Sequence, residues 1–107
     1  DAVKAFIRAT IAGLRLTIKD PGRAIDDVLA QMSSGLRDLE LARLRAVLSD
    51  NIVTDEVKQN GLGSIEAGRF DAGIGQIADD YEFRKRPVAA DIFDESFLPP
   101  PNARKIN

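Results

Sequence analysis

The chain has 107 residues, of which 44 % are hydrophobic and 30 % charged, and its net charge at pH 7 is −2. This length limits it to one domain, and the composition is that of a globular protein and excludes a disordered one. Cysteine and histidine are both absent, which excludes disulfides and thiol chemistry and removes the usual zinc ligands and the commonest general base.

The first thirty residues carry the most extensive apolar pattern of the chain. Apolar side chains at helical spacing predict a helix from about Ala2 to Lys19 with one face directed at a core. This stripe consists of Val3, Phe6, Ile7, Thr10, Ile11, Leu14 and Ile18. Asp20 and Pro21 then predict a corner, with Asp20 as the N-cap of a second helix that ends near Ser33-Ser34-Gly35. We expect this stripe to exceed what the rest of the chain can cover.

Two further helical segments follow. The third helix is predicted to begin near Asp38, as an N-cap, and to stop at the polar sequence Ser49-Asp50-Asn51. Thr54, followed by two acidic residues, predicts a short helical turn that is closed by Gly61.

The fourth long helix is predicted from about Ser64 or Ile65 to Phe83. Tyr81 continues its apolar series and is expected to be a partly buried ring. Gly68, Gly73 and Gly75 lower the helix propensity, so we expect another segment to pack closely there. After Pro87 we expect a short apolar hook, and after the three prolines at 99–101 an extended tail. The sequence thus predicts an all-α fold with four longer helices and short turns, in which residues 1–98 form the helical segment and 99–107 a loose tail.

No combination of residues indicates catalysis. The glycine pairs at 61–63 and 73–75 do not follow a predicted strand and lack a phosphate-binding lysine, so a helix stop and a close crossing explain them better. Adjacent carboxylates such as Asp26-Asp27 and Asp79-Asp80 point about 100° apart on a helix and fit solvated faces better than a metal site. We therefore predict that the chain is not an enzyme, with no catalytic residue, metal or cofactor, and the sequence assigns no ligand-binding residue.

The charges and apolar runs also bear on partners. The 15 basic residues are spread along the sequence, so nucleic acid is not an expected partner. The apolar runs are shorter than the ~20 residues that a membrane-spanning helix needs. The start at Asp1, without a signal-like segment, is what a processed protein or an excised fragment would show.

Four modest motifs occur in a defined order. They are Val3-Lys4-Ala5-Phe6-Ile7-Arg8-Ala9-Thr10, then Asp20-Pro21 with Ala24, then Val53-Thr54-Asp55-Glu56 with Gly61-Leu62-Gly63, and then Phe97-Leu98-Pro99. Together they resemble the C-terminal portion of the bacterial ABC-transporter substrate-binding proteins for nitrate, sulfonate, taurine and thiamine-pyrimidine precursors. The resemblance covers nearly the whole chain, and Phe70 looks like the counterpart of an aromatic residue that this family often has after Gly-Leu-Gly.

The resemblance implies that the parent is a two-lobed α/β periplasmic binding protein of type II that closes on a small solute. It implies a periplasmic or other extracytoplasmic location, delivery of the solute to an ABC permease, and a signal peptide in the parent. This chain would be the helices that return to the first lobe and pack on its sheet, while most solute contacts would lie elsewhere. The relatives that make the thiamine pyrimidine use histidine, so that activity would lie outside this segment.

Two other hypotheses remain open from the sequence. The chain could be an independent helical protein-interaction module without a small-molecule ligand, or, with fewer residues to support it, an enzyme domain. If a sheet normally covers the first helix, the isolated chain would expose an apolar surface and is expected to form a homodimer or to exchange helices.

Overall fold

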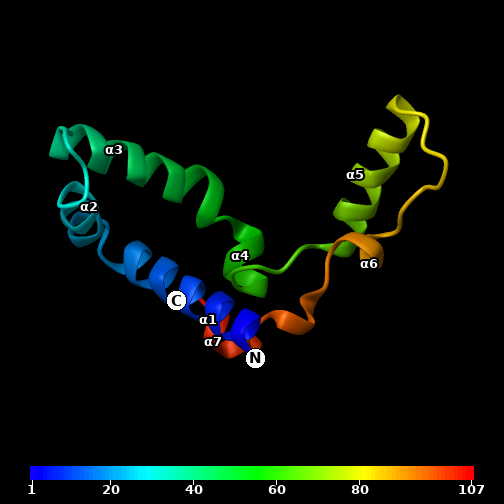
Figure 1. The fold of residues 1–107 in the computed structure, drawn as a ribbon, viewed down its shortest axis with the longest axis horizontal. Helices are drawn as coiled ribbons and strands as arrows, with labels where there is room; N and C mark the ends of the chain where they lie inside the picture. Colours follow the sequence, from blue (N-terminus) through cyan, green and yellow to red (C-terminus); the bar gives the residue numbers. More distant parts are fainter.

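The computed structural model describes residues 1–107 and is all-α, with four longer helices and short helical turns as predicted (Figure 1). The long helices are α1 (Ala2–Lys19), α2 (Pro21–Leu29), α3 (Arg37–Val47) and α5 (Ala67–Asp80). The shorter ones are α4 (Asp55–Asn60), α6 (Ala89–Ile92) and α7 (Pro101–Arg104), with a π-helical turn η1 (Leu48–Ile52) and a 3-10 turn η2 (Glu95–Phe97).

Local capping defines the first two helices. The carboxylate of Asp1 accepts a hydrogen bond from the Val3 amide at 3.0 Å and caps α1. Asp20 is both the end of α1 and the N-cap of α2, where its carboxylate accepts from the Arg23 amide at 3.0 Å. Pro21 is the first residue of α2, a position at which proline loses no helical hydrogen bond. The predicted corner at Asp20-Pro21 is confirmed.

The boundaries of α3 differ from the prediction at both ends. Leu36, not Asp38, is the N-cap residue, and Asp38 lies in the first turn, where its charge favours the helix N-terminus. Ser49-Asp50-Asn51 does not stop the helix. The chain continues through these residues as η1, because the Val53 amide donates to the Leu48 carbonyl at 2.7 Å across five residues.

The two following helices were predicted with different success. The Thr54 hydroxyl accepts from the Val57 amide, α4 follows, and Gly61 ends it with a φ of 82°, all as expected. Helix α5 is shorter than predicted. Its N-cap is Glu66, whose carboxylate accepts from the amides of Gly68 and Arg69, and Tyr81 already has extended backbone.

Residues 99–107 are not the loose, extended tail that we expected. Pro99 and Pro100 precede α7, and Pro101 is its first residue. Arg104, at the end of this turn, is buried, with 7 % of its surface exposed. The tail is fixed in place because the Arg104 side chain donates hydrogen bonds to residues far away in the sequence. The local sequence pattern around Arg104 could not indicate these contacts.

The helices enclose very little core. Five apolar residues are buried, and no side chain is fully buried; the five are Ile11, Ile25, Leu48, Leu62 and Ile74. The accessible surface is 8042 Å², whereas a folded monomer of 11.7 kDa has about 5,900 Å². The radius of gyration is 17.2 Å, compared with about 13 Å for a compact domain of this length. The chain therefore exposes about 2,100 Å² more surface than a compact monomer of the same mass.

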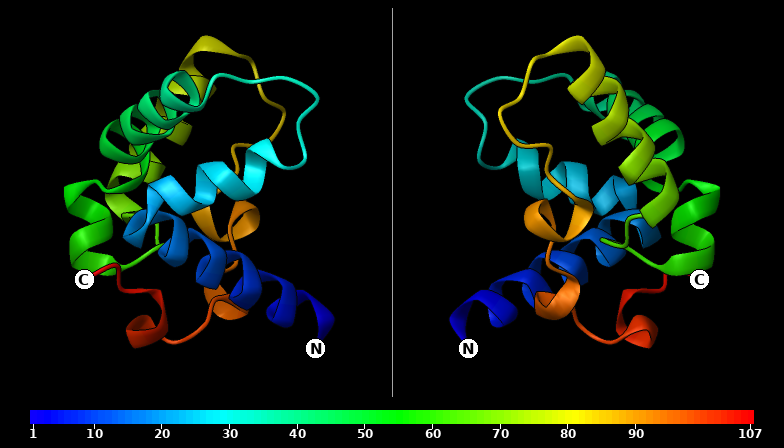
Figure 2. Two further views of the ribbon diagram at one scale, coloured as in Figure 1. Left: turned by 90° about the vertical axis from the view of Figure 1, so that its left-hand side faces the viewer. Right: turned by 90° about the vertical axis from the view of Figure 1, so that its right-hand side faces the viewer.

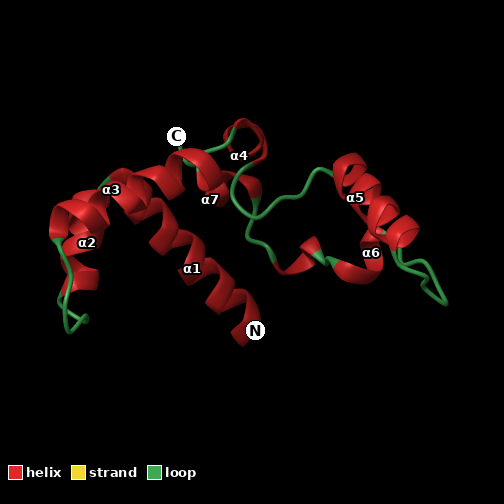
Figure 3. Ribbon diagram, turned by 90° about the horizontal axis from the view of Figure 1, so that it is seen from above, coloured by secondary structure: helices red, strands yellow, loops and turns green.

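The uncovered surface reflects how the helices are arranged. Helices α1 to α4 and α7 lie together, and α5 with α6 extends away from them (Figures 1 and 3). In views along the long axis, the loop between α2 and α3 projects from the rest of the chain (Figure 2). We call α1–α4 with α7 the body and α5–α6 the arm.

Candidate docking surface

An apolar groove of about 360 Å³ runs along one side of α1. Its α1 wall consists of Phe6, Ile7, Thr10, Ile11 and Leu14, and its other wall of Asn51, Ile52, Val57, Leu62, Gly63 and Leu98. The α1 wall is the stripe read from the sequence, whereas the facing wall comes from four separate segments. We call this the α1 groove.

The sides of the α1 groove are covered unequally. Ile11 is buried and Ile7 and Leu14 are half-buried, so the middle of the α1 stripe has found partners within the chain. Phe6, by contrast, is 73 % exposed and Val3 is 52 % exposed. An exposed phenylalanine at the rim of an apolar groove is typical of a surface that another structure covers. The α1 stripe is therefore only partly covered, as the sequence predicted.

A buried arginine holds the facing wall of the groove in place. The Arg104 guanidinium donates to the carbonyls of Pro99 and Leu62, at 2.9 and 3.0 Å, and to the Ser64 hydroxyl. The Leu62 amide in turn donates to the Arg104 carbonyl at 2.9 Å. No carboxylate takes part in this cluster. Arg104 therefore acts as a structural cross-link between α7 and the loop after α4.

Gly61 and Gly63 allow this cross-link because both have positive φ, 82° and 84°. A Cβ at Gly61 would lie 3.1 Å from the Cβ of Arg104, and one at Gly63 would lie 2.9 Å from the Leu98 side chain. The glycine pair is a helix stop and a close approach to the C-terminal segment. This matches the structural interpretation that the sequence favoured over a phosphate loop.

Two ion pairs join neighbouring helices. Arg37 binds Asp26 through two hydrogen bonds of 2.6 and 3.0 Å and joins α3 to α2. This hydrogen bonding holds the pKa of Asp26 below its ordinary value. Arg69 binds Glu56, whose carboxylate also accepts from the Glu66 amide, and joins α5 to α4. The bonds from the amides of Arg69 and Gly68 lower the pKa of Glu66. Glu56 is half-buried, and the other charged groups of these pairs are exposed.

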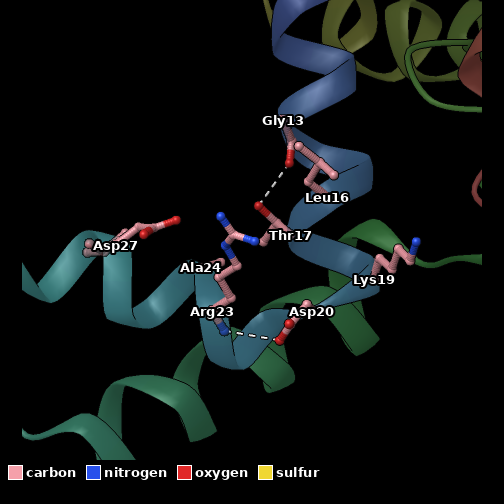
Figure 4. A pocket seen from close by; sticks show the side chains of 9 residues that line it. Gly13, Leu16, Thr17, Lys19, Asp20, Arg23, Ala24 and Asp27 are labelled. Carbon is pink, nitrogen blue, oxygen red and sulfur yellow. Dashed lines mark hydrogen bonds between the residues drawn. The ribbon is translucent and has the colours of Figure 1, made fainter.

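A second hollow lies in the angle between α1 and α2 (Figure 4). Gly13, Leu16, Thr17, Lys19, Asp20, Arg23, Ala24, Asp27 and Val28 line it. Thr17 donates to the Gly13 carbonyl within α1, and Asp20 caps α2, as the dashed lines in Figure 4 show. These polar groups are already used by the backbone, and the remaining charges have mixed signs. Consistent with its role as a structural corner, this hollow presents no convergent set of donors to a ligand.

The arm is the least covered part of the chain. We expected Tyr81 to be partly buried, but it is 65 % exposed because α5 ends at Asp80. The Tyr81 ring stacks only on the Phe83 ring, with the two centroids 6.5 Å apart. A Cβ at Gly73 would meet no other atom within 4 Å, so the prediction of close packing at Gly73 is wrong. At Gly75 the neighbour is the Arg86 side chain, 2.6 Å from where a Cβ would be.

The basic residues are less evenly distributed in space than along the sequence. Lys4, Arg8, Arg15 and Lys19 are four, seven and four residues apart, so at 100° per residue they fall within about 60° of one another on α1. All four are exposed, and none forms an ion pair, although Arg15 donates to the Ala103 carbonyl at 3.2 Å. We call this set the basic stripe. Helical spacing of the cations was the signal that could have revealed it.

The remaining chemistry of the surface is simple. No group of three or more acidic residues is placed to hold a metal ion. None of the helices has the length and apolar character required to span a bilayer. Comparisons with protein-family models, with curated proteins and with solved structures find no match for this chain. The family resemblance in the sequence therefore stays a prediction.

Proposed function

We propose that this chain is the helical C-terminal part of the solute-binding component of an ABC importer for a small anionic or heterocyclic solute. Its location is periplasmic or otherwise extracytoplasmic, and its role in transport is structural. The α1 groove packs on the sheet of the first lobe of the parent, and the solute binds in a cleft formed mainly by other segments. Delivery to the permease is a property of the complete two-lobed protein.

The observation that carries this proposal is the incomplete cover of α1. The four motifs that resemble the solute-binding family include the α1 stripe, the Asp20-Pro21 corner, the Thr54 cap with Gly61-Leu62-Gly63, and Phe97-Leu98-Pro99. Leu62, Gly63 and Leu98 from these motifs line the α1 groove together with Phe6. Motifs that are far apart in sequence thus contribute to one apolar surface, which supports a common packing partner.

A solute-binding test on the complete reading frame distinguishes this role from the others. A ligand that binds only the folded protein stabilises it, by about 2.7 kcal/mol at a hundredfold excess over Kd. We expect nitrate, an alkyl sulfonate such as taurine, or an aminopyrimidine to raise the melting temperature of the complete protein by several degrees. The 107-residue chain serves as the matched control and should show no shift with the same solutes.

Two results would contradict the proposal. If none of these solutes shifts the melting temperature of the complete protein, the solute class is wrong. If the 107 residues turn out to be a complete protein that captures a protein partner through the α1 groove, the chain is an independent interaction module. A Phe6→Asp variant, which places a charge in the groove, would abolish that capture.

A further inference from the structure

The loop between α5 and α6 carries a run of three cations, Arg84-Lys85-Arg86, on an exposed backbone. We propose that this loop, residues 81–88, is a processing site for a protease that cleaves after basic residues. Cleavage there divides the chain between α5 and α6, and the two parts remain associated. This site is a property of the 107-residue chain and does not depend on the proposed transport role.

A protease can bind this loop because nothing holds its backbone in place. Residues 81–86 are all exposed, and residues 82–87 form no backbone–backbone hydrogen bond. The loop lies on the outer side of the arm, away from the body (Figures 1 and 3). Exposed loops are the preferred sites of proteolytic nicking, whereas a helix must first open locally. The loop can therefore enter a protease while the helices stay folded.

The other basic residues of the chain are poorer sites. Of the fifteen, the three in this loop and Lys105 are the only ones outside helices. Lys105 is followed by only two residues, which leaves little chain for a protease to bind beyond the bond to be cut. The carbonyl of its neighbour Arg104 also accepts a hydrogen bond from the Leu62 amide. The loop is thus the place where exposure, free backbone and basic side chains coincide.

Two of the three bonds that follow these cations are susceptible. The bond after Arg86 is the exception, because Pro87 follows it and proline has a fixed φ and no N–H for a protease to bind. The Arg86 guanidinium also lies against α5, 2.6 Å from where a Cβ of Gly75 would be. The Arg84–Lys85 and Lys85–Arg86 bonds remain. Hydrolysis adds one water across either bond, which leaves a carboxylate on the first residue and an amino group on the second.

The charges around the loop favour a protease over a nucleic acid or a membrane. Asp79, Asp80 and Glu82 are exposed beside the three cations, so the charges of residues 79–86 cancel. An anionic lipid surface or a nucleic acid responds to the summed charge of such a region. A trypsin-like protease instead binds one basic side chain in a pocket that contains a carboxylate. Each cation of the loop can therefore be recognised singly, although the neighbouring acids cancel the total.

The C-terminal part stays bound after cleavage because its contacts with the body lie far from the loop. Arg104 donates to the Leu62 carbonyl and to the Ser64 hydroxyl, and its own carbonyl accepts from the Leu62 amide. Arg15 on α1 donates to the Ala103 carbonyl at 3.2 Å. These contacts join α7 to the loop after α4 and to α1, and a cut in the arm breaks none of them. The product is therefore a nicked molecule that stays in one piece.

Limited digestion with trypsin tests the site. Mass spectrometry should place the first internal cut after Arg84 or Lys85, at least about tenfold faster than cuts within the helices, because a helical site must open before it is cleaved. A lysine-specific protease should cut the loop after Lys85 alone. The triple variant Arg84→Gln, Lys85→Gln, Arg86→Gln should lose the cut. Arg45→Gln on α3, an exposed arginine without an ion pair, is the matched control and should be cut in the loop at the original rate.

Native mass spectrometry of the digested protein tests whether the two parts stay together. The nicked chain should keep the mass of the whole chain plus one water, and should give two fragments only after denaturation. Arg104→Ala should release the C-terminal fragment, because it removes the donor to Leu62 and Ser64. Lys105→Ala, the neighbouring exposed cation, is the matched control and should retain it. The original chain alone decides the point if Arg104→Ala does not fold.

Three results would overturn the inference. The first is a first internal cut within a helix, or equal digestion of the loop in the original chain and the triple variant. The second is release of the C-terminal fragment from the original chain as soon as the loop is cut. The third is a loop that trypsin leaves intact in a chain that sediments with phosphatidylglycerol vesicles and loses this binding in the triple variant. That result would assign the three cations to an anionic lipid surface.

Discussion

The body and the arm consist of the same kind of amphipathic helix but are held in very different ways. The body contains four of the five buried apolar residues, Ile11, Ile25, Leu48 and Leu62, counting the loop that follows α4. The arm contains one, Ile74. The body is also cross-linked by Arg104 and by the Arg37–Asp26 pair, whereas α5 is joined to it by Glu56 and an extended loop.

This difference shows that helix formation and helix burial are separate outcomes. Helix α5 has an N-cap, a regular apolar series and 14 residues, yet Ile77 and Tyr81 remain exposed. An isolated helix of this length is marginal in water, and most helical stability in proteins comes from packing. The arm is thus the part of the chain that packing within the chain stabilises least.

The largest effect should come from deleting a buried side chain of the body. Ile11→Ala leaves a cavity beside the α1 groove and should lower the free energy of unfolding by about 2–4 kcal/mol. Ile77→Ala on the arm removes the same atoms from an exposed site and should change it by less than about 0.5 kcal/mol. Urea unfolding of both variants at a concentration where the chain is monomeric measures the difference. Equal losses would show that the arm is packed as tightly as the body.

The next largest effect should come from the buried arginine. Arg104→Ala leaves the Leu62 and Pro99 carbonyls and the Ser64 hydroxyl without their donor, and should cost about 2–3 kcal/mol. Hydrogen exchange should show the loss in the Gly61–Ser64 loop and α7, while the amides of α5 exchange as before. Arg84→Ala, an exposed arginine of the arm without an ion pair, is the control. An equal loss there would mean that Arg104 has no special structural role.

Much of the fold was predictable because its signals are local. The spacing of Phe6, Ile7, Ile11 and Leu14 predicted α1, and the residue types at Asp20-Pro21 predicted the corner. Thr54 and Gly61 marked the two ends of α4 for the same reason. A cap is a hydrogen bond between residues two or three positions apart, so its chemistry can be read from a short segment.

The parts that escaped prediction depend on contacts between distant residues. Arg104 and Leu62 are 42 positions apart, and nothing near Arg104 indicates that its guanidinium will be buried. The continuation of α3 through Ser49-Asp50-Asn51 as a π-helical turn likewise overrides local propensity. For the α1 groove, the sequence predicted the α1 wall alone. The facing wall is assembled from four segments that only the tertiary structure brings together.

The smallest effect should come from acid. Asp26 in the body and Glu66 at the start of the arm both have a pKa below the ordinary carboxyl value, caused by hydrogen bonds from Arg37 and from the amides of Arg69 and Gly68, respectively. A carboxyl group of this kind stabilises the fold at a pH above its ordinary pKa, and this stabilisation is lost as the pH falls through the lowered value. The free energy of unfolding should therefore decrease modestly between about pH 6 and about pH 3.

Glu66→Gln isolates the contribution of Glu66, because glutamine keeps a cap acceptor but has no charge to lose. The variant should show a smaller decrease with acid than the original chain, and the change should be confined to α5 in hydrogen exchange. Glu82→Gln, in the loop after α5, replaces a carboxyl group that makes no hydrogen bond, so the original decrease should remain. If Glu66→Gln altered hydrogen exchange throughout α1–α4 as well, the arm and the body would unfold together. The two regions would then differ in how much surface they expose, but they would not differ in stability.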